Sequence, residues 1–253
     1  EAAEPTQISV AYSEHLRDGF VPAKIGNRNF SFEYKAKAGV NKFVGYMLRL
    51  ACRYIEINSE APIKINKLGI IPQYYPVKVK PVELASATDK AIYDACVRTL
   101  ELCMMEHYVD CPWREQCLYA FDSRNQMLCG YYAFENGNSE YARSNLLLIS
   151  KSRRDDGLLP ICSPCGLSFT IPSFSLHFVV AVYEYYIHTQ DGAFVAEVLP
   201  RIELILNSFL SNAQGNALCK FRGKEHWNFY DWSAGANGRL LEDDEGGIDP
   251  MVN

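Results

Sequence analysis

Apolar and polar positions alternate in short runs over roughly the first third of the chain. Residues 30–34 and 54–58 follow a two-residue period, and residues 46–50 form a nearly continuous apolar run. Prolines and glycines separate these runs at intervals that are typical of strands. Residues 1–84 therefore predict several short strands that form an antiparallel β-sandwich, or part of one.

A helical period replaces the strand pattern near residue 84. Between Thr88 and Tyr108 apolar residues recur three and four positions apart, and Ser86 or Thr88 can cap the start of this helix. Pro200 suits the first turn of the last helix, because proline is tolerated there. Together with the first helix, the pattern predicts helical stretches at about 118–134, 139–152, 174–189 and 200–211.

This change of period predicts two domains, a β domain over residues 1–84 and a helical domain over residues 85–253. The helices are expected to pair as hairpins. Residues 235–253 are rich in glycine and acidic side chains and have no apolar period. The predicted helices therefore form an open arc, and we expect further structure to close it.

Composition narrows the class of protein. With 253 residues, 48% hydrophobic and 22% charged, the chain is typical of globular proteins that bury a core. A net charge of -5 without a basic block argues against a nucleic-acid partner. No apolar stretch reaches the roughly 18 residues that a membrane helix requires, so no membrane partner is expected. Residues 1–10 are acidic and polar and so do not resemble a signal peptide. Because a leader can be removed from a mature protein, the compartment stays open.

The nine cysteines predict free thiols and not a disulfide framework. Cys96 and Cys103 occupy apolar positions of the first predicted helix, where buried thiols are common. Cys162 and Cys165 have the spacing of a zinc or redox pair. A single pair without a second pair or a nearby histidine is a poor metal site, and it does not open a helix after a strand. We therefore expect no functional role for it.

The most informative polar cluster runs from Asp110 to Gln116 and reads Asp-Cys-Pro-Trp-Arg-Glu-Gln, with Asp122 soon after it. The Cys-Pro step is expected to end the first helix, which would place Asp110 and Glu115 on a rigid turn. Carboxylates held at such a junction suit sugar cleavage, which uses one acid and one base. The alternative is a surface ion-pair network around a turn.

The same cluster predicts different protonation states for its acidic side chains. With residues from about 117 helical, Gln116, Tyr119 and Asp122 would lie near one face of the helix. Arg114 would then keep Asp110 or Asp122 ionised. Glu115 would be left as the better proton donor, because a catalytic acid must hold its proton.

Two other segments carry candidate chemistry. His177 lies in an apolar helical run and is expected to be a core or helix-face histidine. Residues 226–232 read His-Trp-Asn-Phe-Tyr-Asp-Trp, and an aromatic platform beside a carboxylate suits a pyranose ring. The alternative is an aromatic plug buried under a loop. Phosphate-binding glycine loops and serine nucleophile elbows are absent, which argues against nucleotide enzymes and serine hydrolases.

The Asp-Cys-Pro-x-Arg-Glu-Gln run with the later Asp122 resembles the signature of bacterial α-L-rhamnosidases, the six-hairpin glycosidases of glycoside hydrolase family 78. Asp156-Gly157-Leu158-Leu159-Pro160 resembles the Asp-Gly-x-x-Pro turn of that family, and residues 231–232 resemble its Asp-Trp motif. The resemblance covers nearly the whole chain. It implies a β-sandwich, here partial, followed by the first helical hairpins of an (α/α)6 barrel.

Residue roles follow from this resemblance. Glu115 falls where the family has its general acid, and Asp110, Arg114 and Asp122 fall where it binds the rhamnose hydroxyls. Trp232 falls on a tryptophan that packs against the sugar.

Other positions match the family's site less closely. Asp231 precedes that tryptophan in the Asp-Trp motif, and Tyr119 stands where the family often has a tryptophan, so both are expected to contact the substrate. Phe174-Ser175-Leu176 replaces a Trp-Gly-Asp sequence, which weakens the expectation of strict rhamnose specificity.

The activity that the resemblance implies is inverting hydrolysis of terminal α-L-rhamnosides, without a metal or other cofactor. The family's general base is a glutamate in the later half of the barrel, so we expect residues 1–253 to be a fragment with little or no turnover by themselves. The implied partner is a rhamnose-containing glycan, the implied compartment is periplasmic or extracellular, and a homo-oligomer is left open. The residues also allow a non-catalytic carbohydrate-binding protein or a purely structural helical scaffold.

Overall fold

The computed structural model describes residues 1–47 and 49–253. The chain separates into two compact units. The first contains residues 1–73 and 111–116, and the second contains residues 74–110 and 117–253. A domain boundary near residue 84 stays a prediction; residues 74–84 lie in the second unit.

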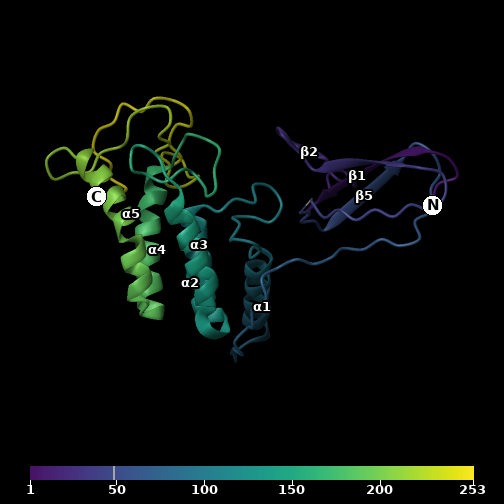
Figure 1. The fold of residues 1–253 in the computed structure, drawn as a ribbon, viewed down its shortest axis with the longest axis horizontal. Helices are drawn as coiled ribbons and strands as arrows, with labels where there is room; N and C mark the ends of the chain where they lie inside the picture. The colour runs from purple at the N-terminus through teal and green to yellow at the C-terminus, as the bar shows by residue number, and fades with distance from the viewer. Residues whose placement is uncertain (48) are drawn as a thin grey trace. The chain divides into compact units, whose positions relative to one another are not determined.

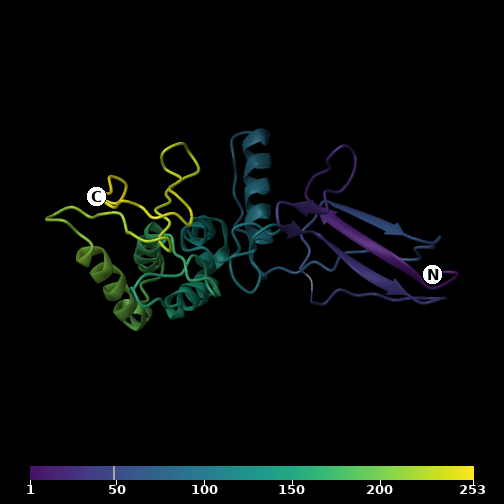
Figure 2. The same ribbon diagram turned by 90° about the horizontal axis from the view of Figure 1, so that it is seen from above.

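The first unit is built on a three-stranded antiparallel sheet with the order β4-β1-β5. Its central strand β1 (Thr6–Ser13) pairs with β4 (Ser31–Ala36) and with β5 (Tyr54–Ser59), and Figure 2 shows the three strands side by side. Val10 faces Phe32 on one side and Ile57 on the other. The strands predicted at 30–34 and 54–58 are thus confirmed.

A short hairpin and a remote segment complete this unit. Strands β2 (Lys24–Ile25) and β3 (Arg28–Asn29) form the hairpin, and Gly26 in its loop has a left-handed φ of 58° that favours glycine. From residues 111–116, Trp113 packs its ring 4.6 Å from the ring of Phe30. Both side chains are buried. Burial of two large aromatic rings holds this segment in the first unit.

The second unit is helical (Figure 1). Helix α2 packs against α4, and α4 also packs against α3 and α5, around a core that contains Leu146, Phe178, Phe194 and Ile205. A 3-10 turn, η1 (Glu135–Asn138), joins α2 to α3. The helices span Ala87–Leu102 in α1, Ala120–Ala133 in α2, Ser139–Lys151 in α3, Pro172–Thr189 in α4 and Gly192–Ser211 in α5.

The three middle helices agree with the sequence prediction to within two residues. At the start of α1, Ser86 is the N-cap, and its side chain accepts a hydrogen bond from the amide of Asp89. The predicted end of α1 is wrong, because the helix stops at Leu102 and Pro112 lies in the loop that follows.

The predicted start of the last helix is also wrong. Helix α5 begins at Gly192, because the carboxylate of Asp191 accepts a hydrogen bond from the amide of Phe194 and caps it. Pro200 therefore lies inside the helix. The buried side chains of Phe194 and Val198 extend the packed face to the N-terminal side of the proline.

The apolar run at residues 46–50 and the predicted burial of Cys96 and Cys103 can also be compared with the structure. In the apolar run, residues 46, 47, 49 and 50 are not in a strand, and Leu48 lies outside the described residues. Cys103 is buried as predicted, whereas Cys96 is exposed, because α1 buries only Val97 and Leu100 along its length. All nine cysteines are free thiols.

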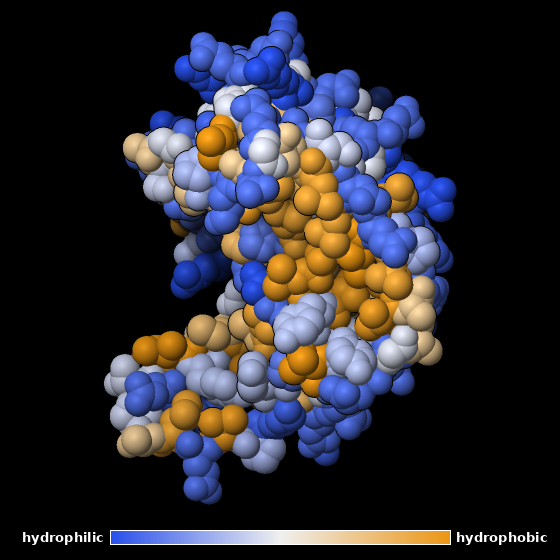
Figure 3. Space-filling view, turned by 90° about the vertical axis from the view of Figure 1, so that its left-hand side faces the viewer, coloured by the Kyte–Doolittle hydropathy of each residue, from blue (hydrophilic) through white to orange (hydrophobic). Residues whose placement is uncertain are grey.

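Helix α5 carries apolar side chains on its outer surface. Leu199, Leu204, Leu206 and Leu210 are all exposed. Figure 3 shows apolar side chains gathered on the face that contains α5. Within the described part of the chain, no helix is long and apolar enough to span a membrane.

Candidate functional site

The loop that carries the acidic cluster is closed by two hydrogen bonds between its ends. The amide of Cys117 donates to Oδ1 of Asp110 at 2.9 Å, and the amide of Asp110 donates to the carbonyl of Cys117 at 3.0 Å. Next to this closure, Nε2 of Gln126 donates to the carbonyl of Val109 at 2.7 Å. Asp110 thus holds the loop through its carboxylate as well as through its backbone.

Among the contacts described for Glu115 within the first unit are those with Cys111, Arg28 and Arg114. The Cys111 thiol donates to Oε2 of Glu115 at 3.0 Å, and Nη2 of Arg28, on β3, donates to Oε1 at 2.9 Å. The Nε of Arg114 lies 3.6 Å from Oε2. Arg114 was expected to hold Asp110 or Asp122 charged. The ion pair that the structure describes for Arg114 is with Glu115.

These neighbours decide the charge of Glu115. Partial burial raises the pKa of its carboxyl group, but the hydrogen bond from Cys111 and the positive charges of Arg114 and Arg28 outweigh burial. The pKa of Glu115 is therefore lowered. Both arginine side chains are about half exposed, with 50% for Arg28 and 53% for Arg114, so solvent competes for these ion pairs.

Gln116 fixes the end of the segment. Its backbone has a left-handed φ of 54°, and its side-chain Nε2 donates to the carbonyl of Pro112 at 2.7 Å and to that of Arg49 at 3.2 Å. The side chain therefore links two parts of the first unit, the turn at Pro112 and the segment at Arg49. This arrangement holds the Pro112–Gln116 turn in one conformation.

The predicted helical face that joins Gln116, Tyr119 and Asp122 is not present. Residues 117–119 are not helical, Tyr119 is the N-cap of α2, and Asp122 lies in the first turn of that helix. The position of Asp122 is thus set by the start of α2.

Two predicted sugar-binding aromatics, Tyr119 and Trp232, belong to one aromatic row. The ring of Tyr119 lies 6.2 Å from that of Phe174, which lies 6.4 Å from that of Phe229. The ring of Phe229 in turn lies 4.9 Å from that of Trp232. The row begins half-buried at Tyr119 and ends at Trp232, which is 76% exposed. The alternative of a fully buried aromatic plug therefore does not hold for Trp232.

Asp231 and Trp232 occupy a tight loop. The amides of Tyr230 and Asp231 both donate to the carbonyl of Ala236, at 2.9 and 3.1 Å. A hydrogen bond with Ser233 lowers the pKa of the exposed Asp231 carboxyl. The loop thus presents a charged carboxylate beside an exposed indole ring.

His177 has the environment expected of a helix-face histidine. It is half-buried, its ring lies 4.2 Å from that of Phe121, and Nη1 of Arg124 is 3.4 Å from its Nδ1. Burial and the charge of Arg124 lower the pKa of His177 to about 4. Arg124 is itself held by a bidentate ion pair with Glu184, at 2.6 and 2.9 Å. His177 is therefore neutral near pH 7.

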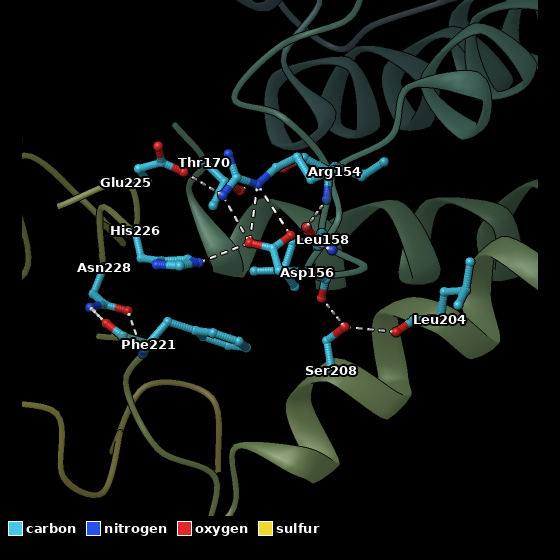
Figure 4. A network of polar contacts seen from close by, with 12 residues as sticks. Arg154, Asp156, Leu158, Thr170, Leu204, Ser208, Phe221, Glu225, His226 and Asn228 are labelled. Atoms are coloured by element: carbon cyan, nitrogen blue, oxygen red, sulfur yellow. Dashed lines mark hydrogen bonds and ion pairs between the residues drawn. The ribbon is translucent and has the colours of Figure 1, made fainter. Parts of the chain in front are cut away.

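A polar network that the sequence did not predict joins the connection between α3 and α4 to the segment that follows α5 (Figure 4). The carboxylate of Asp156 contacts Nε2 of His226 at 2.9 Å and accepts hydrogen bonds from Arg154 at 2.8 Å and from the Leu158 amide at 3.1 Å. Arg154 also reaches Glu225 at 3.3 Å. Burial raises the pKa of Asp156, but these hydrogen bonds and the charge of Arg154 lower it well below its usual range.

The same network explains the glycine in the Asp-Gly-x-x-Pro turn. Gly157 has a φ of 81°, and a Cβ at this position would collide with Oγ of Ser208 and lie 3.1 Å from the Leu204 carbonyl. Ser208 donates from that hydroxyl to the carbonyl of Asp156 at 2.6 Å. Both motifs, the turn at 156–160 and His226, were visible in the sequence, but their contact was not.

The chain thus has an antiparallel β sheet followed by helices, with a carboxylate-bearing loop between α1 and α2. A family model described as the bacterial alpha-L-rhamnosidase 6 hairpin glycosidase domain matches residues 82–245. The chain belongs to this family. The predicted fold class, a partial β domain followed by the first helical hairpins, is confirmed.

Solved structures of rhamnosidases are similar to this chain. The family 78 rhamnosidase of Bacillus sp. GL1 is 28% identical, with a TM-score of 0.83 over 96% of this chain and 25% of that chain. The rhamnosidase from Klebsiella oxytoca, solved with rhamnose bound, is 19% identical, with a TM-score of 0.73 over 94% of this chain and 49% of that chain. The chain therefore spans between a quarter and a half of these proteins. Comparison with curated proteins finds no match.

Proposed function

We propose that this chain is part of an inverting glycoside hydrolase that acts on terminal α-L-rhamnosides. The observation that carries the proposal is the Asp110–Cys117 closure, because it holds a carboxylate-bearing loop rigid in a chain of the rhamnosidase family. Related structures are named as rhamnosidases, and one was solved with rhamnose bound. The proposed substrate is a rhamnose-containing glycan.

In this proposal Glu115 protonates the glycosidic oxygen. Asp110, Arg114 and Asp122 bind the hydroxyl groups of the sugar, and the exposed ring of Trp232 packs against its C–H face. Tyr119 and Asp231 complete the contacts from the two ends of the aromatic row. An inverting reaction also needs a carboxylate base that activates water on the opposite face of the sugar, and no described residue is proposed for that role.

The charge of Glu115 adds a condition to the proposal. A general acid must be protonated before it reacts, whereas the neighbours of Glu115 favour its ionised form. The two arginines that contact it are half exposed, and exposed ion pairs are weak, so displacement by substrate costs little. We infer that sugar binding displaces Arg28 or Arg114 and restores the proton to Glu115.

The test is Glu115→Gln in the full-length enzyme, assayed on aryl α-L-rhamnosides whose leaving groups differ in acidity. Poor leaving groups need protonation, so their rate is expected to fall by about 100-fold or more, and that of activated leaving groups by far less. Glu140→Gln, at an exposed position of α3, serves as the control and is expected to leave both rates unchanged. Equal losses for both kinds of leaving group would refute the acid role.

A non-catalytic carbohydrate-binding protein is the second candidate. The exposed Trp232 beside Asp231 favours a binding protein, because an aromatic ring next to a carboxylate can bind a sugar without a catalytic acid. Rhamnose binding measured by calorimetry separates the two candidates. Binding that survives Glu115→Gln, with no hydrolysis by the full-length protein, would support the binding protein and refute the hydrolase.

A further inference from the structure

The backbone that leads to the exposed indole ring of Trp232 is fixed on the start of α4 and the residues before it. The amide of Trp227 donates to the carbonyl of Thr170 at 2.9 Å, and Thr170 is buried. The hydroxyl of Ser173, in the first turn of α4, donates to the carbonyl of Phe229 at 2.8 Å. The chain is therefore held at two points before it reaches the exposed ring.

The chain that follows Trp232 returns to the Trp227 side chain. Nε1 of Trp227 donates to the carbonyl of Asn237 at 2.8 Å. Gly238 has a left-handed φ of 58°, and a Cβ there would lie 2.4 Å from the carbonyl oxygen of Asn228 and 3.2 Å from Cδ1 of Trp227. A glycine is therefore needed for the backbone to pass this close to the indole ring. The Trp227 side chain thus closes the loop that carries Trp232.

The Trp227 ring also contacts the Trp232 ring itself. Their centroids are 5.8 Å apart, with an angle of 67° between the ring planes. Aromatic rings in an edge-to-face arrangement attract each other beyond the effect of the area that they bury. Trp227 is half-buried, whereas Trp232 is 76% exposed. The half-buried ring is therefore the fixed member of the pair, and the exposed ring is held against it.

Phe229 contacts both tryptophans. Its ring centroid lies 4.8 Å from that of Trp227 and 4.9 Å from that of Trp232. Phe229 is buried in the core of the helical unit, whereas Trp227 packs against the edge of that core. A substitution at Phe229 would disturb the core as well as the loop. Trp227 is therefore the residue at which the support of Trp232 can be tested.

We propose that Trp227 is a positioning residue for sugar binding, which holds the Trp232 ring in place through ring contact and through the hydrogen bond that closes the loop. The proposal rests on the function proposed above, in which Trp232 packs against the C–H face of a terminal α-L-rhamnoside. An exposed ring on an unrestrained loop would lose conformational freedom when it binds a sugar, and this loss weakens binding. Contact with Trp227 restricts the ring before the sugar arrives, so less affinity is lost.

The experiment measures rhamnose binding to the full-length protein by calorimetry for Trp227→Phe, Trp232→Ala and the double variant. Trp227→Phe removes the N–H donor and part of the ring, and its affinity should fall by about 3-fold. Trp232→Ala should lose about 5- to 10-fold. Because Trp227 acts through Trp232, the double variant should bind no more weakly than Trp232→Ala alone. Tyr183→Phe, at an exposed position of α4, is the control and should bind rhamnose as the wild type does.

Fluorine NMR tests the same contact without sugar. The protein is labelled with fluorotryptophan, and the resonance of Trp232 is assigned by its loss in Trp232→Ala. In Trp227→Phe this resonance should become narrower and move toward that of the free amino acid, because an unrestrained exposed ring moves on a fast timescale. Gly238→Ala is a second variant that should have the same effect, because its Cβ would push the backbone away from Trp227 and open the loop.

Two results would overturn the positioning role. One is a double variant in which the two losses of affinity multiply, which would mean that Trp227 affects binding independently of Trp232. The other is a Trp232 resonance that both Trp227→Phe and Gly238→Ala leave unchanged. A wild-type protein that binds no rhamnose would instead refute the proposed function. The two failures are distinguishable because the resonance is measured without sugar.

Discussion

Asp110 and Cys117 hold each other through two hydrogen bonds, one of which uses the Asp110 carboxylate. A residue that the family resemblance assigns to sugar binding is therefore also a structural clamp. The two roles can be separated by substitution.

Asp110→Ala removes the acceptor and should lower the free energy of unfolding by about 1–2 kcal/mol. Asp110→Asn keeps an oxygen for the Cys117 amide, so its cost should be smaller. If Asp110 also binds a sugar hydroxyl as an anion, the asparagine variant should still lose about 10-fold or more in kcat/KM in the full-length enzyme. Urea unfolding and steady-state kinetics measure both effects. Wild-type kinetics for Asp110→Asn would leave Asp110 with a structural role only.

Arg28→Ala should raise the pKa of Glu115, because it removes one of the two positive charges beside that carboxylate. A general acid loses activity as pH rises through its pKa, so a higher pKa moves this loss to higher pH. Hydrolysis above neutral pH should then increase by up to about 5-fold, as expected for one exposed ion pair. The measurement is the pH profile of kcat/KM.

Two variants control the Arg28 experiment. Arg28→Lys keeps the charge and should shift the profile less, and Arg17→Ala removes an exposed charge that lies elsewhere in the first unit. An unchanged profile for Arg28→Ala would show that Arg28 does not set the protonation of Glu115.

Asp156→Asn should lower the free energy of unfolding by about 2 kcal/mol at pH 7, because it removes the charge that holds Arg154 and His226. The pKa of Asp156 is depressed in the folded state, so its contribution is complete above the unfolded value of about 3.9 and is lost as pH falls below it. The difference between wild type and variant should therefore shrink from pH 5 to pH 3. Urea unfolding across this range measures it.

Asp155→Asn is the matched control for that experiment, since Asp155 is the exposed neighbour of Asp156 in the same loop. It should change stability by less than about 0.5 kcal/mol. A loss for Asp156→Asn that stays constant down to pH 3 would mean that packing, and not charge, accounts for the effect.

Trp232→Ala should weaken rhamnose binding by about 5- to 10-fold and leave the melting temperature nearly unchanged, because the ring is 76% exposed. Phe229→Ala, in the same aromatic row but buried, should instead lower the free energy of unfolding by about 3 kcal/mol. Calorimetry with rhamnose and thermal unfolding separate the two effects. Undiminished binding in Trp232→Ala would remove this ring from the proposed sugar site.

Local patterns in the sequence predicted much of the secondary structure. The two-residue period at 30–34 and 54–58 corresponds to strands β4 and β5, and the helical periods correspond closely to α2, α3 and α4. The period of a segment is set by which of its side chains face the core, so it can be read without knowing what covers that face.

Helix boundaries were predicted less well, because more than one local signal competes at each end. Proline at 112 and at 200 indicated a helix end and a helix start, yet α1 had already ended at Leu102 and α5 had already begun after Asp191. A capping carboxylate and the burial of Phe194 outweighed the preference of Pro200 for a first turn.

The sequence alone determined the family, the fold class and the acidic segment from Asp110 to Glu115, since each rests on residues close together in the chain. The tertiary structure decided which distant residues meet. Asp156 contacts His226 only because packing of the helices brings their loops together. Spacing along a chain carries no information about such a contact, and so the charge of Asp156 became apparent only in the folded protein.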